Sequence, residues 1–196
     1  MLKKHIIWGA VLGLSSFSAV AENNFSAELL GGVADQELSA NGNSVSGAET
    51  SFGIRGAFSL NKNFAIEAAY QNYGEASDTR VGNLGSILNG SLTTTALNFG
   101  VKGMLPLNSS VSLNARLGLS IWDFEYKETN SSFPGQTAKD DDNGSSLYYG
   151  IGVQYEVNPQ IFVGAEYTIT QIDASINNVS SDLDIKNMSL SLGFKF

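Results

Sequence analysis

Strict alternation of apolar and polar residues is the feature that most constrains the fold of this chain. It is clearest in the last ten residues, Asn187–Phe196, where the apolar residues of one side are Met188, Leu190, Leu192, Phe194 and Phe196. The residues between them are polar or glycine. A period of two predicts a strand with one apolar and one polar face. The sequence therefore ends on a strand whose last residue is aromatic.

The same alternation recurs in segments of about ten residues along the chain. It predicts eight strands: Phe25–Val33, Ser51–Leu60, Phe64–Gln71, Ala96–Leu105, Val111–Ile121, Leu147–Val157, Ile161–Ile169 and Asn187–Phe196. Short turns alternate with long polar stretches, which we interpret as loops. These predicted loops are Gln36–Gly47, Gly74–Gly90, Lys127–Gly144 and Asp173–Asp182. Every proline falls in a turn or loop, as expected because proline cannot donate to a strand ladder.

Residues 1–21 have the pattern of a secretory signal peptide. Lys3 and Lys4 precede the short apolar run Ile6–Leu14, and small residues lead to a predicted cleavage between Ala21 and Glu22. An N-terminal membrane anchor is the alternative, but the apolar run is shorter than the roughly 20 residues of a spanning helix. We therefore expect residues 22–196 to be exported as one mature domain, whose fold the strand pattern indicates.

No other segment approaches the length of an apolar spanning helix, and in lipid only helices and closed barrels satisfy every backbone polar group. An even number of strands, with short turns at one end and long connections at the other, is typical of outer-membrane barrels. The predicted fold is all-β: an eight-stranded antiparallel up-and-down transmembrane β-barrel in the bacterial outer membrane. Both termini are expected on the periplasmic side, with the short turns.

A soluble barrel with an apolar ligand cavity is the rival architecture, and the polar face decides between the two. That face carries many glycines together with charges of both signs near mid-strand. The charged residues are Arg55, Glu67, Lys102, Arg116, Glu156 and Glu166. A mid-strand Arg or Lys facing lipid would cost about 2–4 kcal/mol. We therefore assign these residues to a lumen network, structural or gating, in which Glu67 and Lys102 are expected to pair.

The closing strand is similar to the C-terminal strand of bacterial outer-membrane barrels. On this resemblance Leu192, Phe194 and Phe196 form an assembly signal read by the barrel assembly machinery.

Composition excludes several functions. Loss of the signal removes Lys3 and Lys4 and moves the formal charge from −8 to −10, so nucleic acid is not an expected partner. There is no Cys, and the single histidine, His5, lies in the predicted signal, so we expect no enzyme with a His- or Cys-based site. We predict no cofactor and no metal site. Asp140–Asp142 could hold a divalent cation but lacks the spacing of a calcium loop, which favours a solvated acidic loop.

Several stretches resemble the transmembrane domain of the outer membrane protein A family over the whole mature chain. They are Ala65–Tyr70, Val101–Gly103, Ala115–Gly118 followed by Trp122, Gly152–Tyr155, Pro159–Ile161, Glu166–Tyr167 and Leu190–Gly193. The resemblance implies an eight-stranded barrel with structural and surface-interaction roles and, in some members, a small or gated pore. Many members continue into a peptidoglycan-binding domain, but the stretches that carry the resemblance here belong to the barrel, so attachment to the cell wall is not implied.

The family's lumen ion pairs carry over only in part. Glu67 and Lys102 match two of its positions, but Gln154 replaces the acidic residue on strand six and Gly164 the basic residue on strand seven. Glu156 is a candidate substitute for the first, and strand seven offers none for the second. The resemblance therefore does not imply a complete salt-bridge switch.

Two classes of function follow. The first is a monomeric structural barrel for envelope integrity, adhesion or recognition, with outer-membrane lipid, lipopolysaccharide and host or phage surface ligands as expected partners. The second is a small passive or gated channel.

Overall fold

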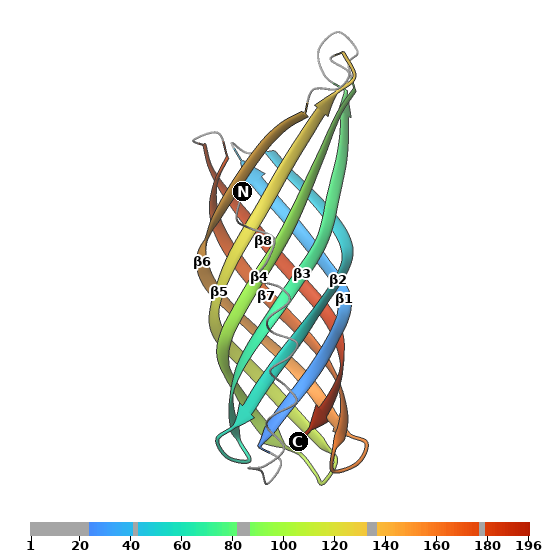
Figure 1. The fold of residues 1–196 in the computed structure, drawn as a ribbon, viewed down its shortest axis with the longest axis vertical. Coiled ribbons are helices and arrows are strands. Elements are labelled where there is room, and N and C mark those ends of the chain that lie inside the picture. The colour runs from blue at the N-terminus through green and yellow to red at the C-terminus, as the bar shows by residue number, and fades with distance from the viewer. Residues whose placement is uncertain (1–23, 41–42, 82–86, 133–136, 177–178) are drawn as a thin grey trace.

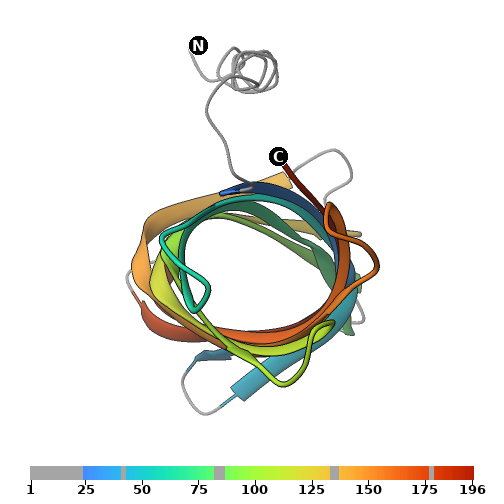
Figure 2. The same ribbon diagram turned by 90° about the horizontal axis from the view of Figure 1, so that it is seen from below.

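Eight antiparallel strands close into a barrel in the computed structural model, which describes residues 24–40, 43–81, 87–132, 137–176 and 179–196 (Figures 1 and 2). The strands are β1 (Phe25–Ala40), β2 (Asn43–Ser59), β3 (Phe64–Val81), β4 (Ile87–Pro106), β5 (Val111–Asn130), β6 (Thr137–Glu156), β7 (Ile161–Ile176) and β8 (Val179–Lys195). Each strand pairs with its neighbours in sequence, and β8 closes the ring against β1. The predicted fold class is confirmed. The signal peptide, with Ala21 and Glu22, lies outside the described residues.

The predicted division into two faces is also confirmed over the lower part of the barrel. Outward-facing apolar side chains are exposed, for example Leu117 at 60% and Leu190 at 66%. The charged residues of the opposite face are buried inside, among them Arg55 and Glu67. An apolar outer surface around a charged interior is the arrangement expected of a barrel surrounded by lipid. No helix long and apolar enough to cross a membrane occurs among the described residues.

In each of the three short turns, an asparagine side chain makes the same pair of hydrogen bonds to the backbone. The side-chain Oδ1 of Asn61 accepts hydrogen bonds from the backbone N–H groups of Asn63 (2.8 Å) and Phe64 (3.0 Å). Asn108 and Asn158 make the equivalent pair of bonds in the other two turns. Such side-chain to backbone bonds favour tight turns. The sequence therefore determines this end of the barrel locally.

The four long polar stretches are mostly strand, so their prediction as loops is wrong. Strands reach Ala40 and resume at Asn43, and the corresponding limits of the next connection are Val81 and Ile87. The other two connections likewise keep strand pairing far beyond the predicted ends, and β3 to β6 rise above the remaining strands (Figure 1). In β6 the residues Thr137–Gly144 are polar on both faces, and backbone pairing with β5 keeps them in the strand.

The alternation of apolar and polar residues reverses partway along β5, so that the apolar face changes from the outside to the inside of the barrel. In β5 the outward residue Ile121 is followed by outward Asp123, while Trp122 and Phe124 point inward and are buried. Below this point apolar residues face out and polar residues face in. Above it the pattern is that of a water-soluble barrel, with an apolar interior. We infer that the strands leave the lipid at this reversal, and we call the part of the barrel above it the extracellular extension.

A bulge in β3 helps to build this extension. The pairing of β3 with β4 shifts between Asn72 and Glu75, and Gly74 has a φ of +86°. Gly74 N–H donates to Asn72 Oδ1 (2.8 Å), and a Cβ at Gly74 would lie 2.7 Å from the carbonyl oxygen of Thr50. The bulge leaves Tyr73 buried inside the barrel. Glycine is suited to this position because other residues rarely adopt positive φ.

Candidate functional site in the barrel interior

Three carboxylates and three cations meet inside the lower barrel: Glu28, Glu67 and Glu166 with Arg55, Lys102 and Arg116. We call these six residues the lumen network. They come from six different strands, and every member is less than a tenth exposed. Their formal charges cancel. Buried charges persist only when they are paired and hydrogen-bonded. Each of the six residues has an ion-pair partner in the network, although Glu28 Oε1 and Arg55 Nε make no hydrogen bond.

Arg55 is the centre of the lumen network. Its guanidinium donates to both oxygens of Glu166, from Nη2 to Oε1 at 2.6 Å and from Nη1 to Oε2 at 2.8 Å. Nη1 also donates to Glu28 Oε2 at 3.1 Å, and Nε lies 3.7 Å from Glu67 Oε2. Two-point bonding of guanidinium to carboxylate is among the strongest ion-pair geometries. Arg55 thereby links β1, β2, β3 and β7 across the lumen.

Arg116 completes the far side of the network. Its Nε donates to Glu67 Oε2 at 3.2 Å, and its Nη1 lies 2.8 Å from Glu166 Oε2. Glu67 also accepts a hydrogen bond from the Tyr148 hydroxyl at 3.1 Å. Two arginines and a tyrosine therefore surround Glu67.

The predicted pairing of Glu67 with Lys102 is wrong. Lys102 Nζ donates to Gln154 Oε1 at 2.7 Å and lies 3.8 Å from Glu28 Oε1. In the β3–β4 register Lys102 stands opposite Ala65, whereas Glu67 stands opposite Gly100. Equal distance from the strand centre does not place two residues opposite each other, because register is set by the turn and by barrel stagger.

Glycines on the lumen face make room for Tyr148. A Cβ at Gly100 would lie 2.5 Å from the Tyr148 hydroxyl, and one at Gly118 would lie 2.6 Å from its ring and 2.2 Å from the carbonyl oxygen of Phe99. The glycine-rich polar strand faces thus allow a large side chain to cross the lumen and reach Glu67.

Glu156 lies apart from the lumen network, nearer the short turns. It accepts hydrogen bonds from Lys195 Nζ (2.7 Å) and Gln154 Nε2 (2.7 Å). The Nζ atoms of Lys102 and Lys195 lie 5.8 and 5.6 Å from the centre of the Phe162 ring, within range of cation–π attraction. Below these residues a cavity of about 740 Å³ opens among the turns. Sequence reasoning placed Glu156 in the main network, and the structure places it in this lower layer.

An apolar cluster fills the barrel above the lumen network, and sequence reasoning missed it. Its members are Ala34, Tyr73, Leu92, Ala96, Trp122, Phe124, Ile172, Leu183 and Ile185. They come from β1, β3, β4, β5, β7 and β8, so side chains meet across the barrel axis. Trp122 and Phe124 stack with ring centres 5.9 Å apart. We call this group the upper plug. The reversal of alternation after Ile121 was the available signal.

The interior chemistry is that of ion pairs and packing. Each carboxylate of the lumen network contacts at least one cation, which leaves none poised as a free acid or base. Among the residues that the structure describes, no group of three or more metal-ligating side chains converges. Asp140–Asp142 lie in β6 rather than in a loop, so successive carboxylates point to opposite faces of the strand.

The proposed assembly signal forms the end of the closing strand. In β8, Leu192 pairs with Leu29 of β1, and Phe194 pairs with Ala27. Phe196 N–H donates to the carbonyl oxygen of Phe25 at 2.8 Å, and its ring lies 5.0 Å from that of Phe194. All three side chains of the signal are exposed on the outer surface. Recognition by assembly machinery remains a prediction.

Comparison with known proteins places this geometry among bacterial barrels. The family model described as the outer membrane protein beta-barrel domain matches residues 9–196. Outer membrane protein A of Escherichia fergusonii is 25% identical over 144 residues, which are 74% of this chain and 39% of that protein. That of Shigella flexneri is 26% identical over 145 residues, again 39% of its length. The chain thus spans less than half of the curated relatives it matches.

Solved structures share the fold at low identity. The outer membrane protein OprG of Pseudomonas aeruginosa has a TM-score of 0.58 at 13% identity, covering 89% of this chain and 97% of that one. The attachment invasion locus protein Ail of Yersinia pestis, in complex with the heparin analogue sucrose octasulfate, has a TM-score of 0.55 at 18% identity. That match covers 89% of this chain and 99% of Ail.

Proposed function

Because the chain belongs to the outer membrane protein β-barrel domain family, we propose that it serves the bacterial outer membrane as a sealed structural barrel with an extracellular interaction surface. Its location in that membrane follows from the family and from the barrels it resembles. An envelope role fits every one of these similarities. The choice between a structural barrel and a channel is our proposal.

The observation that carries the proposal is that two different plugs lie in series within the barrel. The lumen network joins six strands through buried ion pairs, and the upper plug joins six strands through apolar contacts. Rearrangement of ion pairs alone would leave the upper plug in place. Ion passage would then require charges to cross an apolar layer, which is strongly unfavourable without water or a partner charge.

The channel hypothesis has weaker support. The cavity of about 740 Å³ opens on the side of the short turns, and Lys102 and Phe162 stand among its lining residues. Lys102 lies against Gln154, which does not bear the charge that an ion-pair switch needs. A salt-bridge switch like that of the outer membrane protein A family would therefore lack one of its two ion pairs.

The extracellular extension is the surface through which we expect interactions. Outward residues of β5 and β6 there include Asp123, Glu125 and Asp141, with Lys127 bonded to Glu125. Sucrose octasulfate, held by Ail, is a polyanion. The acidic surface of this chain would repel such a ligand, so we propose cationic or neutral surface partners for it.

Conductance in planar lipid bilayers tests the proposal. The mature protein and a variant with Arg55→Ala should give no discrete openings, because the upper plug remains. A combined Trp122→Ala and Phe124→Ala variant, checked for folding by gel mobility before and after boiling, serves as the comparison. Regular openings of the unmodified protein would overturn the sealed-barrel proposal and support the channel.

A further inference from the structure

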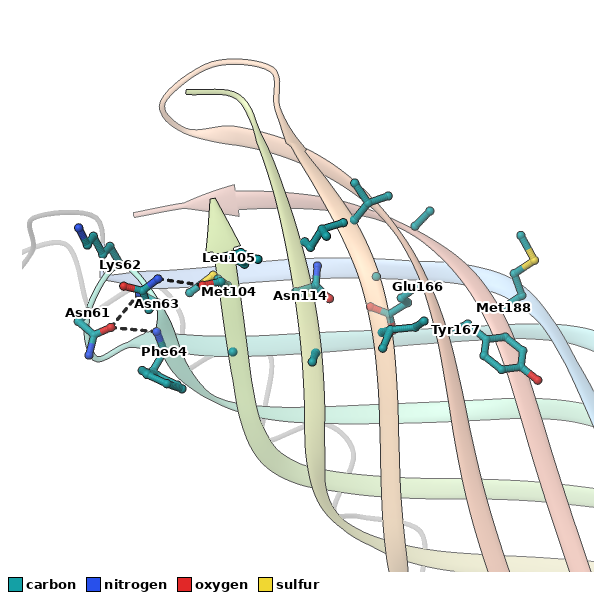
Figure 3. A pocket seen from close by; sticks show the side chains of 17 residues that line it. Asn61, Lys62, Asn63, Phe64, Met104, Leu105, Asn114, Glu166, Tyr167 and Met188 are labelled. Carbon is teal, nitrogen blue, oxygen red and sulfur yellow. Dashed lines mark hydrogen bonds between the residues drawn. The ribbon is translucent and has the colours of Figure 1, made fainter. Parts of the chain in front are cut away.

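An apolar groove crosses the outer surface of the barrel from the β2–β3 turn towards β8. One wall follows a row of residues that are paired across successive strands: Phe64, Gly103, Ala115, Ile151, Tyr167 and Met188. The groove encloses about 1100 Å³. Figure 3 shows Asn61, Asn63 and Phe64 at one end and Tyr167 and Met188 at the other.

Small outward residues make this surface concave. Gly103, Ala115 and Ala165 lie between larger neighbours, which include Leu105 and Leu113. A Cβ placed at Gly103 would approach nothing closer than 3.9 Å, so the space beside it is open. Asn114 and Glu166 are buried towards the lumen and take part in its bonds, so only their backbone faces the groove. The groove is therefore an apolar depression of the lipid-facing outer surface, separate from the lumen.

Lys62 places a positive charge at the end of the groove next to the short turn. It lines both the groove and the cavity among the turns. In the described ranges of the chain, no ion pair joins Lys62 to a carboxylate, whereas nearby Lys195 is bound to Glu156 at 2.7 Å. The bonds of Asn61 and Asn63 hold the turn, and Asn63 Nδ2 donates to the carbonyl oxygen of Met104 at 3.0 Å.

We propose that this groove binds an anionic phospholipid of the periplasmic leaflet, with its phosphate at Lys62 and one acyl chain along Gly103, Ala115 and Ile151. The short turns face the periplasm in such barrels, so Lys62 lies at the depth of lipid headgroups. A lysine at an anionic membrane surface favours binding about fivefold. A flexible chain fills a narrow concave groove more completely than the convex wall of a second barrel can.

A second outer groove provides an internal comparison. It encloses about 640 Å³, and its lining includes Ala27, Gly56 and Ala68 together with the aromatic residues Phe25 and Phe194. Lys62 is not among its lining residues. The proposal therefore predicts charge selectivity at the first groove and none at the second.

Electron paramagnetic resonance of spin-labelled lipids tests the proposal on the folded mature protein in phosphatidylcholine bilayers. Spin-labelled phosphatidylglycerol should show a larger motionally restricted fraction than labelled phosphatidylcholine, by about fivefold in relative affinity. Lys62→Gln should abolish this preference. Lys127→Gln, which removes a cation at the opposite end, should leave it unchanged. Unaltered selectivity in Lys62→Gln would overturn the proposal.

Substitutions that fill the groove with a larger side chain test the proposal independently of Lys62. Gly103→Leu should reduce the restricted fraction of both lipids, whereas Gly31→Leu, at an outward glycine with nothing within 4 Å, should not. Equal effects of the two variants would overturn the proposal. Because the chain has no native Cys, Ala115→Cys also tests a second copy as the occupant. Efficient disulfide-linked dimers would assign the groove to a protein interface instead.

Discussion

Removal of the Arg55 guanidinium should be one of the most destabilising single changes inside the barrel. In Arg55→Met, Glu166 keeps Arg116 at 2.8 Å, but Glu28 keeps only Lys102 at 3.8 Å. A buried carboxylate that loses its partner costs about 3–5 kcal/mol. Glu28→Gln should cost less, about 1.5–3 kcal/mol, because Lys102 loses its contact with Glu28 but keeps its hydrogen bond to Gln154. Arg55 would still bind Glu166 at two points.

The double variant distinguishes pairing from independent damage. When Glu28 is neutral, loss of Arg55 no longer leaves it as an unpaired buried charge. The double variant should therefore lose less unfolding free energy than the sum of the two single variants, by about 0.5–3 kcal/mol. Urea unfolding in lipid vesicles can be followed by Trp122 fluorescence. Trp8 lies in the predicted signal peptide, which would make Trp122 the single tryptophan of the mature chain.

An exposed ion pair supplies the matched control. The side chains of Lys127 and Glu125 are 40% and 45% exposed, so Lys127→Met should cost at most about 1 kcal/mol. Strict additivity of the Arg55 and Glu28 changes would refute the assignment of these two as partners. A cost for Arg55→Met no larger than that of Lys127→Met would show that the lumen screens charge as water does.

Three further predictions concern packing and assembly. Phe124→Ala should destabilise the barrel by about 3–5 kcal/mol, because the side chain is buried in the upper plug. Urea unfolding would measure this loss, and a loss below 1 kcal/mol, typical of surface changes, would contradict a packed interior. Gly118→Val should prevent folding, since its Cβ would lie 2.2 Å from the carbonyl oxygen of Phe99, whereas Gly103→Ala should fold normally by gel mobility. Deletion of Phe196 should reduce surface levels in cells more than refolding in detergent, and equal effects would count against an assembly signal.

The local sequence pattern determined much of the fold of this protein. The period of two identified every strand near the short turns and which of its faces points outward, because successive residues of a strand point to opposite sides. The asparagine turns are similarly local, as Asn61 bonds residues two and three positions later. Charge near mid-strand also indicated a buried lumen network. Arg55, Glu67, Lys102, Arg116 and Glu166 all take part in it.

Barrel closure decided which of those residues meet. Arg55 and Glu166 are 111 positions apart in sequence, and they bond only because β2 and β7 face each other across the lumen. The pairing expected for Glu67 and Lys102 was wrong for the same reason: stagger shifts each strand along the axis, so strand position does not give distance across the interior. The sequence prediction missed Glu28, which stands directly opposite Arg55 on the neighbouring strand β2, because neither strand by itself contains the register that pairs them.

The extracellular extension shows where local pattern and tertiary structure combine. The reversal after Ile121 is written in the sequence, where Trp122 and Phe124 take the side that was polar before it. A single strand with that pattern could end, turn or continue. It continues because apolar residues from six strands converge inside one closed ring, and their mutual burial offsets the entropy of ordering the long polar connections. No one strand contains that information, since the stabilising contacts exist only between strands.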